Sequence, residues 1–274
     1  MFSVDLIINC YEGTQEKVLS KIFIHEVLNQ NKYNFKNVFI VINNVRDKRS
    51  IAKKAGKLKK EGVINGYFFV EDYIDKVLKF VKIKKGDLEP ILHYSDWALV
   101  SIYISKSAYL LHWDPDVYLE RSIDWVSPSL DKMMSKRSFM VASPLLKGSS
   151  GVMRHESYQE DENYFYNDDF SDQIFLVRKK DFLRPIYGHN HIYSLRFPLA
   201  HIGSVFEKRI DSYMKRQNKI RIIFKKVPYL HLKNNGFPYP KTNIFRVCLH
   251  YIFMVIVIVY YHTFLSIKKM LLRL

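Results

Sequence analysis

The chain has 274 residues, of which 48% are hydrophobic and 26% charged, so it can bury the core of one large domain and is not a disordered chain. Its formal net charge of +16 favours an anionic partner: a nucleic acid, an anionic lipid surface or a phosphorylated substrate. The two cysteines, Cys10 and Cys248, match no metal-binding or redox spacing, which indicates a reducing, cytoplasmic setting. No secretory signal is expected at the N-terminus.

Four short apolar segments in the first half of the chain predict buried strands, at residues 4–10, 37–43, 66–70 and 108–113. Helices are expected between them, at residues 14–29, at residues 48–60, and once or twice within residues 73–105. Strands that alternate with helices predict an α/β fold with a mostly parallel, Rossmann-like sheet flanked by helices. Ligands of such sheets bind beyond the carboxyl ends of the strands, so Asn9, Asn43, Glu71 and Asp114 are expected at one edge.

The pattern is less regular after residue 117. Strands are predicted at residues 138–143, 174–177 and 220–226, and a helix at residues 197–218. Residues 148–172 are polar and acidic and predict a long loop, and residues 227–240, with three prolines, predict irregular structure.

The C-terminal segment, residues 247–265, is mostly apolar and is followed by Lys268, Lys269 and Arg273. It predicts a helix that lies in or dips into an anionic membrane surface. A single membrane span and a buried helix of the core are the two alternatives.

Two carboxylates, Asp114 and Asp116, follow the fourth predicted strand, with Pro115 between them. Pro115 restricts Asp114 to extended conformations. Two neighbouring acidic groups repel each other unless a cation lies between them, and a hard divalent ion such as Mg²⁺ or Mn²⁺ suits carboxylate ligands and phosphate oxygens. The alternative interpretation is an ordinary Asp-Pro-Asp surface turn.

This acidic-x-acidic pattern, about a hundred residues into an alternating α/β chain, resembles the DxD motif of GT-A nucleotide-sugar glycosyltransferases, including those of bacterial envelope polysaccharide synthesis. The resemblance implies that the ends of the first strands hold the nucleotide sugar and that the DxD residues bind a metal ion that bridges its phosphates. The implied nucleotide-sugar-binding residues are Asn9, Tyr11, Asn43, Glu71 and Asp114.

The resemblance also implies metal ligands and a catalytic base. Asp114 and Asp116 would bind Mn²⁺ or Mg²⁺, and His231 resembles the late histidine that completes the metal shell in some relatives. An acidic residue before the strand at residue 174 would deprotonate the acceptor hydroxyl; Asp172 is preferred for this role and Asp169 is the alternative.

The sequence therefore predicts a metal-dependent glycosyltransferase at the cytoplasmic face of a membrane, which moves a sugar to a glycan or lipid-linked acceptor. Residues 1–240 would form the GT-A-like domain, with 1–118 binding the nucleotide sugar and 119–240 facing the acceptor, and 241–274 the membrane-associating tail. The alternative is a basic nucleic-acid- or membrane-binding protein on a catalytically silent GT-A-like scaffold. No zinc, RRM or basic heptad pattern is present, so no nucleic-acid partner is expected.

Overall fold

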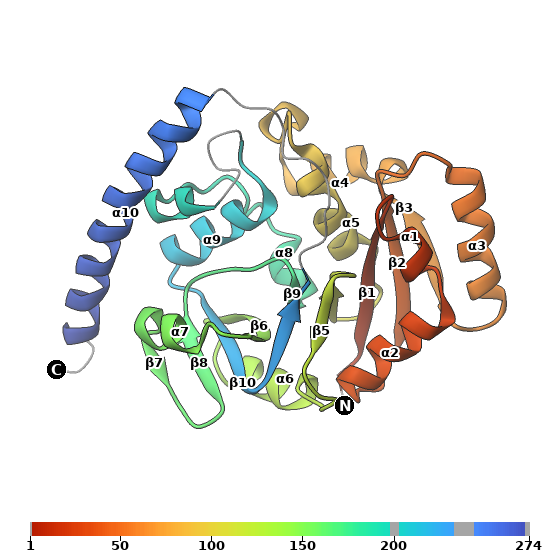
Figure 1. Cartoon of the computed structure of the whole chain (residues 1–274), viewed down its shortest axis with the longest axis horizontal. Helices are drawn as coiled ribbons and strands as arrows, with labels where there is room; N and C mark the ends of the chain where they lie inside the picture. The colour runs from red at the N-terminus through yellow and green to blue at the C-terminus, as the bar shows by residue number, and fades with distance from the viewer. Residues whose placement is uncertain (1, 198–202, 233–243, 272–274) are drawn as a thin grey trace.

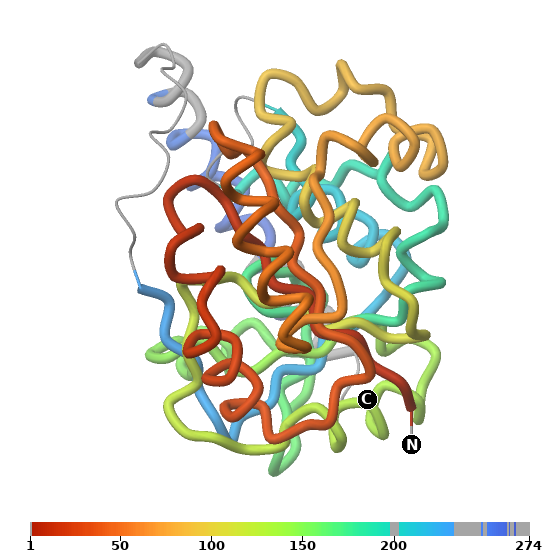
Figure 2. The backbone as a smooth tube through the Cα atoms, turned by 90° about the vertical axis from the view of Figure 1, so that its right-hand side faces the viewer, coloured from red at the N-terminus to blue at the C-terminus, as the bar shows by residue number. Residues whose placement is uncertain are grey.

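The computed structural model describes residues 2–197, 203–232 and 244–271. Its centre is a ten-stranded sheet with the strand order β3-β2-β1-β4-β9-β6-β10-β8-β7, and β5 pairs with β10 outside this path. Helices cover both faces of the sheet, and the C-terminal helix lies along one side of the molecule (Figure 1). The N-terminal strands and helices, in red and orange, face the viewer in Figure 2.

The N-terminal half of the sheet is parallel, as the sequence predicted. Its strands are β1 (Val4–Tyr11), β2 (Asn37–Asn43), β3 (Gly66–Phe69) and β4 (Tyr109–Trp113). The connecting helices are α1 (Gln15–Val18), α2 (Lys21–Asn31), α3 (Lys48–Lys60), α4 (Ile74–Val81) and α5 (Asp96–Ile104), with short 3₁₀ turns η1 (Val70–Asp72), η2 (Lys85–Asp87) and η3 (Leu92–Tyr94). The single helix expected at residues 14–29 is two helices, because Ser20 adopts an extended backbone and its side chain caps α2 by accepting a hydrogen bond from the Phe23 N–H.

The C-terminal half of the sheet is mixed, so the prediction of a mostly parallel sheet is wrong there. The strand β9 (Ile174–Arg178) runs antiparallel between β4 and β6 (Phe139–Leu146). The strand β10 (Ile220–His231) is parallel to β6 and antiparallel to β5 (Val117–Leu119) and β8 (Tyr164–Asn167). The helices of this half are α6 (Val126–Ser135), α7 (Ser150–Glu156), α8 (Lys179–Phe182) and α9 (Phe206–Arg216), with the 3₁₀ turn η4 (Ile192–Arg196).

Two predicted irregular segments are partly regular. The expected loop at residues 148–172 contains α7, β7 (Gln159–Glu160) and β8. Residues 227–231 belong to β10, which continues through Pro228 with a shift in its register against β6 between Phe224 and Pro228. The helix expected at residues 197–218 is shorter. Residues 198–202 and 233–243 lie outside the described residues.

The sheet separates two hydrophobic cores. Alternate β1 side chains (Leu6, Ile8 and Cys10) enter the core under α2, α3 and α6, and Ile7 enters the core under α4, α5 and α9. The opposite faces of one strand therefore build both cores, which explains the run of three consecutive apolar residues, Leu6–Ile8, in its sequence.

The apolar C-terminal segment forms α10 (Ile244–Leu271), and part of one side of it packs on η4. Within the three described ranges, no helix combines the length and apolarity that crossing a bilayer requires.

Candidate active site

The turn after β4 places the two predicted metal-binding aspartates at the carboxyl edge of the sheet. The Asp114 N–H donates to the Gln173 carbonyl at 3.0 Å, and the Val117 N–H lies 3.4 Å from the Asp114 carbonyl. The ammonium group of Lys17 in α1 donates a hydrogen bond to the Pro115 carbonyl. The backbone of the turn is thus held from two sides, and its direction is set by contacts distant in sequence.

The same turn is joined to the end of β10. Val117 is paired with His231 in the antiparallel ladder, and the Leu232 N–H donates to the Asp116 carbonyl at 2.8 Å. The His231 Nε2 atom lies 3.2 Å from Asp116 Oδ2. A histidine that follows Asp116 by more than a hundred residues therefore reaches its carboxylate.

Gln173 contacts the other side of the His231 imidazole, and Tyr229 in turn orients Gln173. The amide nitrogen of Gln173 lies 3.2 Å from His231 Nδ1, and the Tyr229 hydroxyl donates to the Gln173 amide oxygen at 2.7 Å. With the Gln173 amide donating, Nδ1 is the acceptor, so Nε2 carries the proton that faces Asp116. Hydrogen bonding to Asp116 is the main cause that raises the pKa of His231.

Negative charge is concentrated at this edge. Burial, followed by the charge of Asp116, raises the pKa of Asp114 to about 7. Burial, followed by the charge of Asp114, raises the pKa of Asp172 to about 7. A carboxyl with a pKa near neutrality exchanges protons under physiological conditions, as a general base must.

Asn9 and His112 lie beside Asp114. Asn9 donates its amide to Asp114 Oδ1 at 3.2 Å. His112 is stacked between the rings of Trp97 and Phe175, and its Nε2 lies 3.9 Å from Asp114 Oδ1. Burial lowers the pKa of His112 to about 3, so this imidazole is neutral and does not offset the charge of Asp114.

The predicted metal ligands are not preformed as a metal centre. Among the described residues, no three or more His, Cys, Asp or Glu side chains are grouped closely enough to hold a metal ion. Instead the His231 imidazole faces the Asp116 carboxylate. The residue types nevertheless fit a hard divalent ion, because the buried atom Asp116 Oδ1 has no hydrogen-bond partner among the described groups.

The other predicted nucleotide-binding residues follow neighbouring strands but make different contacts. Tyr11 ends β1, and its backbone N–H donates to the Thr14 hydroxyl. Asn43 donates to Asp96 Oδ1 at 3.1 Å. Glu71 is exposed and pairs with Lys48 at 3.3 Å. The structure therefore places these side chains along the edge without joining them to the carboxylates after β4.

The two candidate bases differ in their surroundings. Asp172 directly precedes Gln173 and feels the charges of Asp114 and Asp116. Asp169 is paired with Arg221 at 3.1 Å, and this arginine also donates to the Ser143 hydroxyl. The carboxylate of Asp169 is thus engaged by a cation, whereas that of Asp172 faces other carboxylates.

Sequence reasoning did not identify four residues near this edge: Lys17, Asp96, Gln173 and Glu207. Glu207 lies in the first turn of α9, and burial followed by the charge of Asp172 raises its pKa well above the usual range. Burial also raises the pKa of Asp96 to about 7. Only Gln173 carried a sequence signal, because it directly follows Asp172 at the start of a strand.

A cavity of about 780 Å³ lies elsewhere, at the amino-terminal ends of β6 and β10. Its lining includes Lys132, Phe139, Tyr166 and Asp168, and it does not include Asp114, Asp116 or His231.

No protein-family model and no curated protein sequence matches the chain. Solved structures are similar to it. The crystal structure of GalNAc-T7 with UDP, GalNAc and Mn²⁺ matches 91% of this chain and 47% of its own length, with a TM-score of 0.53 and 8% sequence identity. TarS of S. aureus matches with a TM-score of 0.46 and 13% identity, over 84% of this chain and 37% of its own. Mouse xyloside xylosyltransferase 1, solved in its apo form, matches with a TM-score of 0.46 and 13% identity, over 78% of this chain and 82% of its own.

The chain spans about half the length of GalNAc-T7, and at 8% identity the likeness concerns the fold alone. It nevertheless covers nearly the whole chain, including both halves of the sheet. The predicted GT-A resemblance is thereby confirmed at the level of structure: the chain has the fold of a GT-A glycosyltransferase.

Proposed function

We propose that the protein is a metal-dependent glycosyltransferase that transfers a sugar from a nucleotide-sugar donor to a glycan or lipid-linked acceptor. The observation that carries the proposal is the group of carboxylates at the carboxyl edge of this GT-A fold. Asp114, Asp116 and Asp172 influence one another electrostatically, and His231 is the one basic side chain within hydrogen-bond distance of their carboxylates among the described interactions. Without a cation, several buried carboxylates close together raise the free energy of the folded protein, because their charges repel one another.

In this proposal Asp114, Asp116 and His231 hold Mn²⁺ or Mg²⁺, and Asn9 orients Asp114 through its amide. The bound ion supplies Lewis-acid neutralisation of the departing nucleoside diphosphate. Tyr11, Asn43 and Glu71, which follow the adjacent strands, contribute to donor binding along the same edge.

Asp172 is proposed to accept the proton of the acceptor hydroxyl. Burial, the main cause of its raised pKa, favours this role, because a base must be deprotonated at the working pH and still take up a proton. Asp169 is the less suitable candidate, since releasing it from Arg221 would leave a buried guanidinium without its partner.

We also propose that the enzyme works at the cytoplasmic face of a membrane, in the synthesis of an envelope polysaccharide. The net charge of +16 supports an anionic surface as a partner. The domain division at about residue 240 belongs to the same proposal, with α10 as the membrane-associating part.

The test is thermal stabilisation by a panel of nucleotide sugars, with and without Mn²⁺, followed by turnover of the ligand that stabilises most. A ligand that binds only the folded state raises the melting temperature. Asp116→Asn is expected to abolish the Mn²⁺-dependent part of the stabilisation and to lower turnover by at least about a hundredfold. Asp161→Asn, which changes a carboxylate beside the 780 Å³ cavity, is the control. Turnover by Asp116→Asn at the wild-type rate would refute the proposal.

A further inference from the structure

The outer surface of α10 is apolar between residues 251 and 260. Its exposed large side chains are Tyr251, Ile252, Phe253, Val255, Ile256, Ile258, Val259 and Tyr260. Soluble monomers rarely expose a contiguous apolar surface of this kind unless something covers it.

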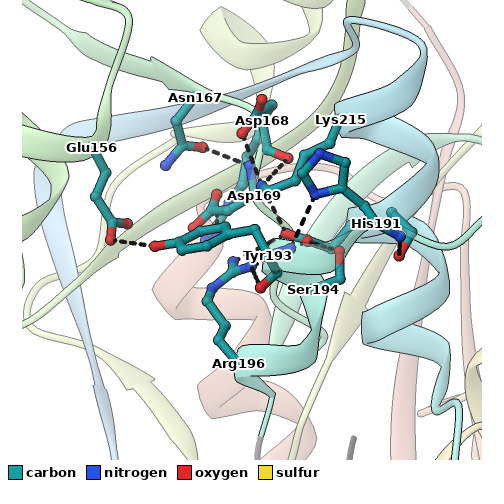
Figure 3. Close-up of polar contacts among 12 residues, drawn as sticks. Glu156, Asn167, Asp168, Asp169, His191, Tyr193, Ser194, Arg196 and Lys215 are labelled. Carbon is teal, nitrogen blue, oxygen red and sulfur yellow. Dashed lines mark hydrogen bonds and ion pairs between the residues drawn. The ribbon is translucent and has the colours of Figure 1, made fainter. Parts of the chain in front are cut away.

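The inner side of α10 is fixed to the rest of the protein. Met254, Val257 and Tyr261 are buried at helical spacing. The ring of Tyr261 stacks on that of Tyr193 with centroids 3.5 Å apart and an interplanar angle of 9°, and its hydroxyl donates to Asp168 Oδ1 at 2.9 Å. Figure 3 shows the receiving cluster, in which Tyr193 and Asp168 lie close to Lys215.

This attachment determines which side of α10 faces outward. Successive residues of a helix turn by about 100°, so Ile252, Val255 and Val259 lie opposite to Met254, Val257 and Tyr261. The side chains of Ile252, Val255, Ile256 and Val259 are 61–63% exposed. A helix clamped by Tyr261 cannot rotate these residues inward without breaking its contacts with Tyr193 and Asp168.

We propose that the outward side of α10, centred on Ile252, Val255, Ile256 and Val259, is a membrane-docking surface that inserts into an anionic lipid bilayer. This inference deepens the proposed membrane location and identifies the side chains that make the contact. The exposed stretch Tyr251–Tyr260 is about 15 Å long, and a helix that lies in the plane of the membrane surface can insert the side chains of one side into a single leaflet.

The charges along α10 favour an anionic lipid surface over a second copy of the chain as the partner of this surface. Residues 244–271 contain no Asp or Glu, whereas Arg246 precedes the exposed stretch and Lys268 and Lys269 follow it. Basic residues on either side of an apolar surface suit anionic headgroups. In a dimer built on this face, the basic ends of the two helices would meet in either orientation, with no acidic residue on α10 to pair with them.

The test uses the full chain and sedimentation with two kinds of vesicle, phosphatidylcholine alone and phosphatidylcholine with phosphatidylglycerol. The variant is Ile252→Gln/Val255→Gln/Val259→Gln. The matched control makes the same change at three exposed apolar residues outside α10, Ile22→Gln/Phe80→Gln/Val152→Gln. Circular dichroism and thermal unfolding verify that both variants are folded.

Wild type and control are expected to bind the vesicles that contain phosphatidylglycerol, and the α10 variant to bind them at least about tenfold more weakly. Wild-type binding of the α10 variant to these vesicles overturns the proposal. So does a size-exclusion profile in which the variant converts a dimer to a monomer while vesicle binding is unchanged, because a second copy then covers the face.

The proposed catalytic function is tested separately on the same proteins. With a soluble acceptor and no lipid, the α10 variant should keep the wild-type turnover, whereas Asp116→Asn should lose turnover and keep vesicle binding. Loss of vesicle binding by the α10 variant therefore supports the docking surface even if no glycosyl transfer is found. If wild type shows turnover but does not bind vesicles, the catalytic proposal is supported and the docking surface is overturned.

Discussion

Replacing Lys215 by methionine should destabilise the protein severely, although this residue lies outside the proposed active site. Its side chain is 2% exposed, and its ammonium lies 2.8 Å from Asp168 Oδ1 and 3.2 Å from Asp211 Oδ1. Arg196 also pairs with Asp211, at 3.0 Å. Two carboxylates thus face two cations inside the protein. Figure 3 shows Asp168, Lys215 and Arg196 of this group.

Methionine keeps most of the volume of the lysine stem and removes the charge. Asp168 then loses its only cation among the described ion pairs. Leaving one partner of a buried ion pair uncompensated costs about 3–5 kcal/mol. In a domain of this size, a loss of about 1 kcal/mol in unfolding free energy lowers the melting temperature by about 2–4 °C. The melting temperature of the variant should therefore fall by about 6–20 °C.

The pH dependence and a second variant test the electrostatic cause. In wild type, although burial opposes it, Lys215 holds the pKa of Asp168 below its usual value. Without Lys215 this folded-state pKa rises above the unfolded one, so the variant should lose stability as the pH rises through that interval and recover part of it in acid. Asp168→Asn added to Lys215→Met should restore much of the loss. A urea titration in which the single variant matches wild type, or in which the double variant is no more stable than the single one, would refute this reasoning.

Three further predictions concern individual side chains. Gln173→Leu should weaken Mn²⁺ binding measured by calorimetry by about 10–100-fold, because His231 loses the amide that orients it, while Gln159→Leu at an exposed strand should not. Asp96→Asn should make stability less dependent on pH: the buried carboxyl, with a pKa of about 7 against 3.8 ordinarily, takes up a proton on folding and contributes a loss of up to about 4 kcal/mol between pH 4 and 7 in wild type, and the variant should lack this contribution. Tyr261→Phe should lower the unfolding free energy by about 1 kcal/mol or more through loss of the hydrogen bond to Asp168, and an unchanged melting temperature would argue against docking of α10.

The strands of the first half were predictable because each is a short apolar run, and β1, β2 and β4 are buried on both faces. Residues 37–43 and 48–60 were assigned with the observed bounds of β2 and α3. In the second half the signal failed where neighbours far apart in sequence decide the structure. Residues 227–231 look irregular because of Pro228, yet they extend β10, whose end pairs with β5.

The same distinction applies to the candidate site. Asp114 and Asp116 were identifiable because a carboxylate pair follows a buried strand. The contact of Asp116 with His231 depends on the pairing of β5 with β10, which no local pattern contains. Glu207 was missed for a similar reason: its position in α9 reads as an ordinary first-turn acid, and only the folded chain brings its charge near Asp172.

Some buried carboxylates of this chain are compensated by neighbouring groups and others are not. At the amino end of β1, Asp5 accepts hydrogen bonds from Ser105, Ser107 and Asn37, and these hold its pKa below the usual value despite burial.

Asp168 and Asp211 are likewise matched by lysine and arginine, whereas Asp114 and Asp172 have pKa values of about 7 because burial and mutual repulsion are not compensated. In a chain with 43 lysines and arginines, a shortage of cations cannot explain that difference. Strain of this kind persists in a native protein when the group is used, and a divalent cation together with a diphosphate is a partner that would relieve it.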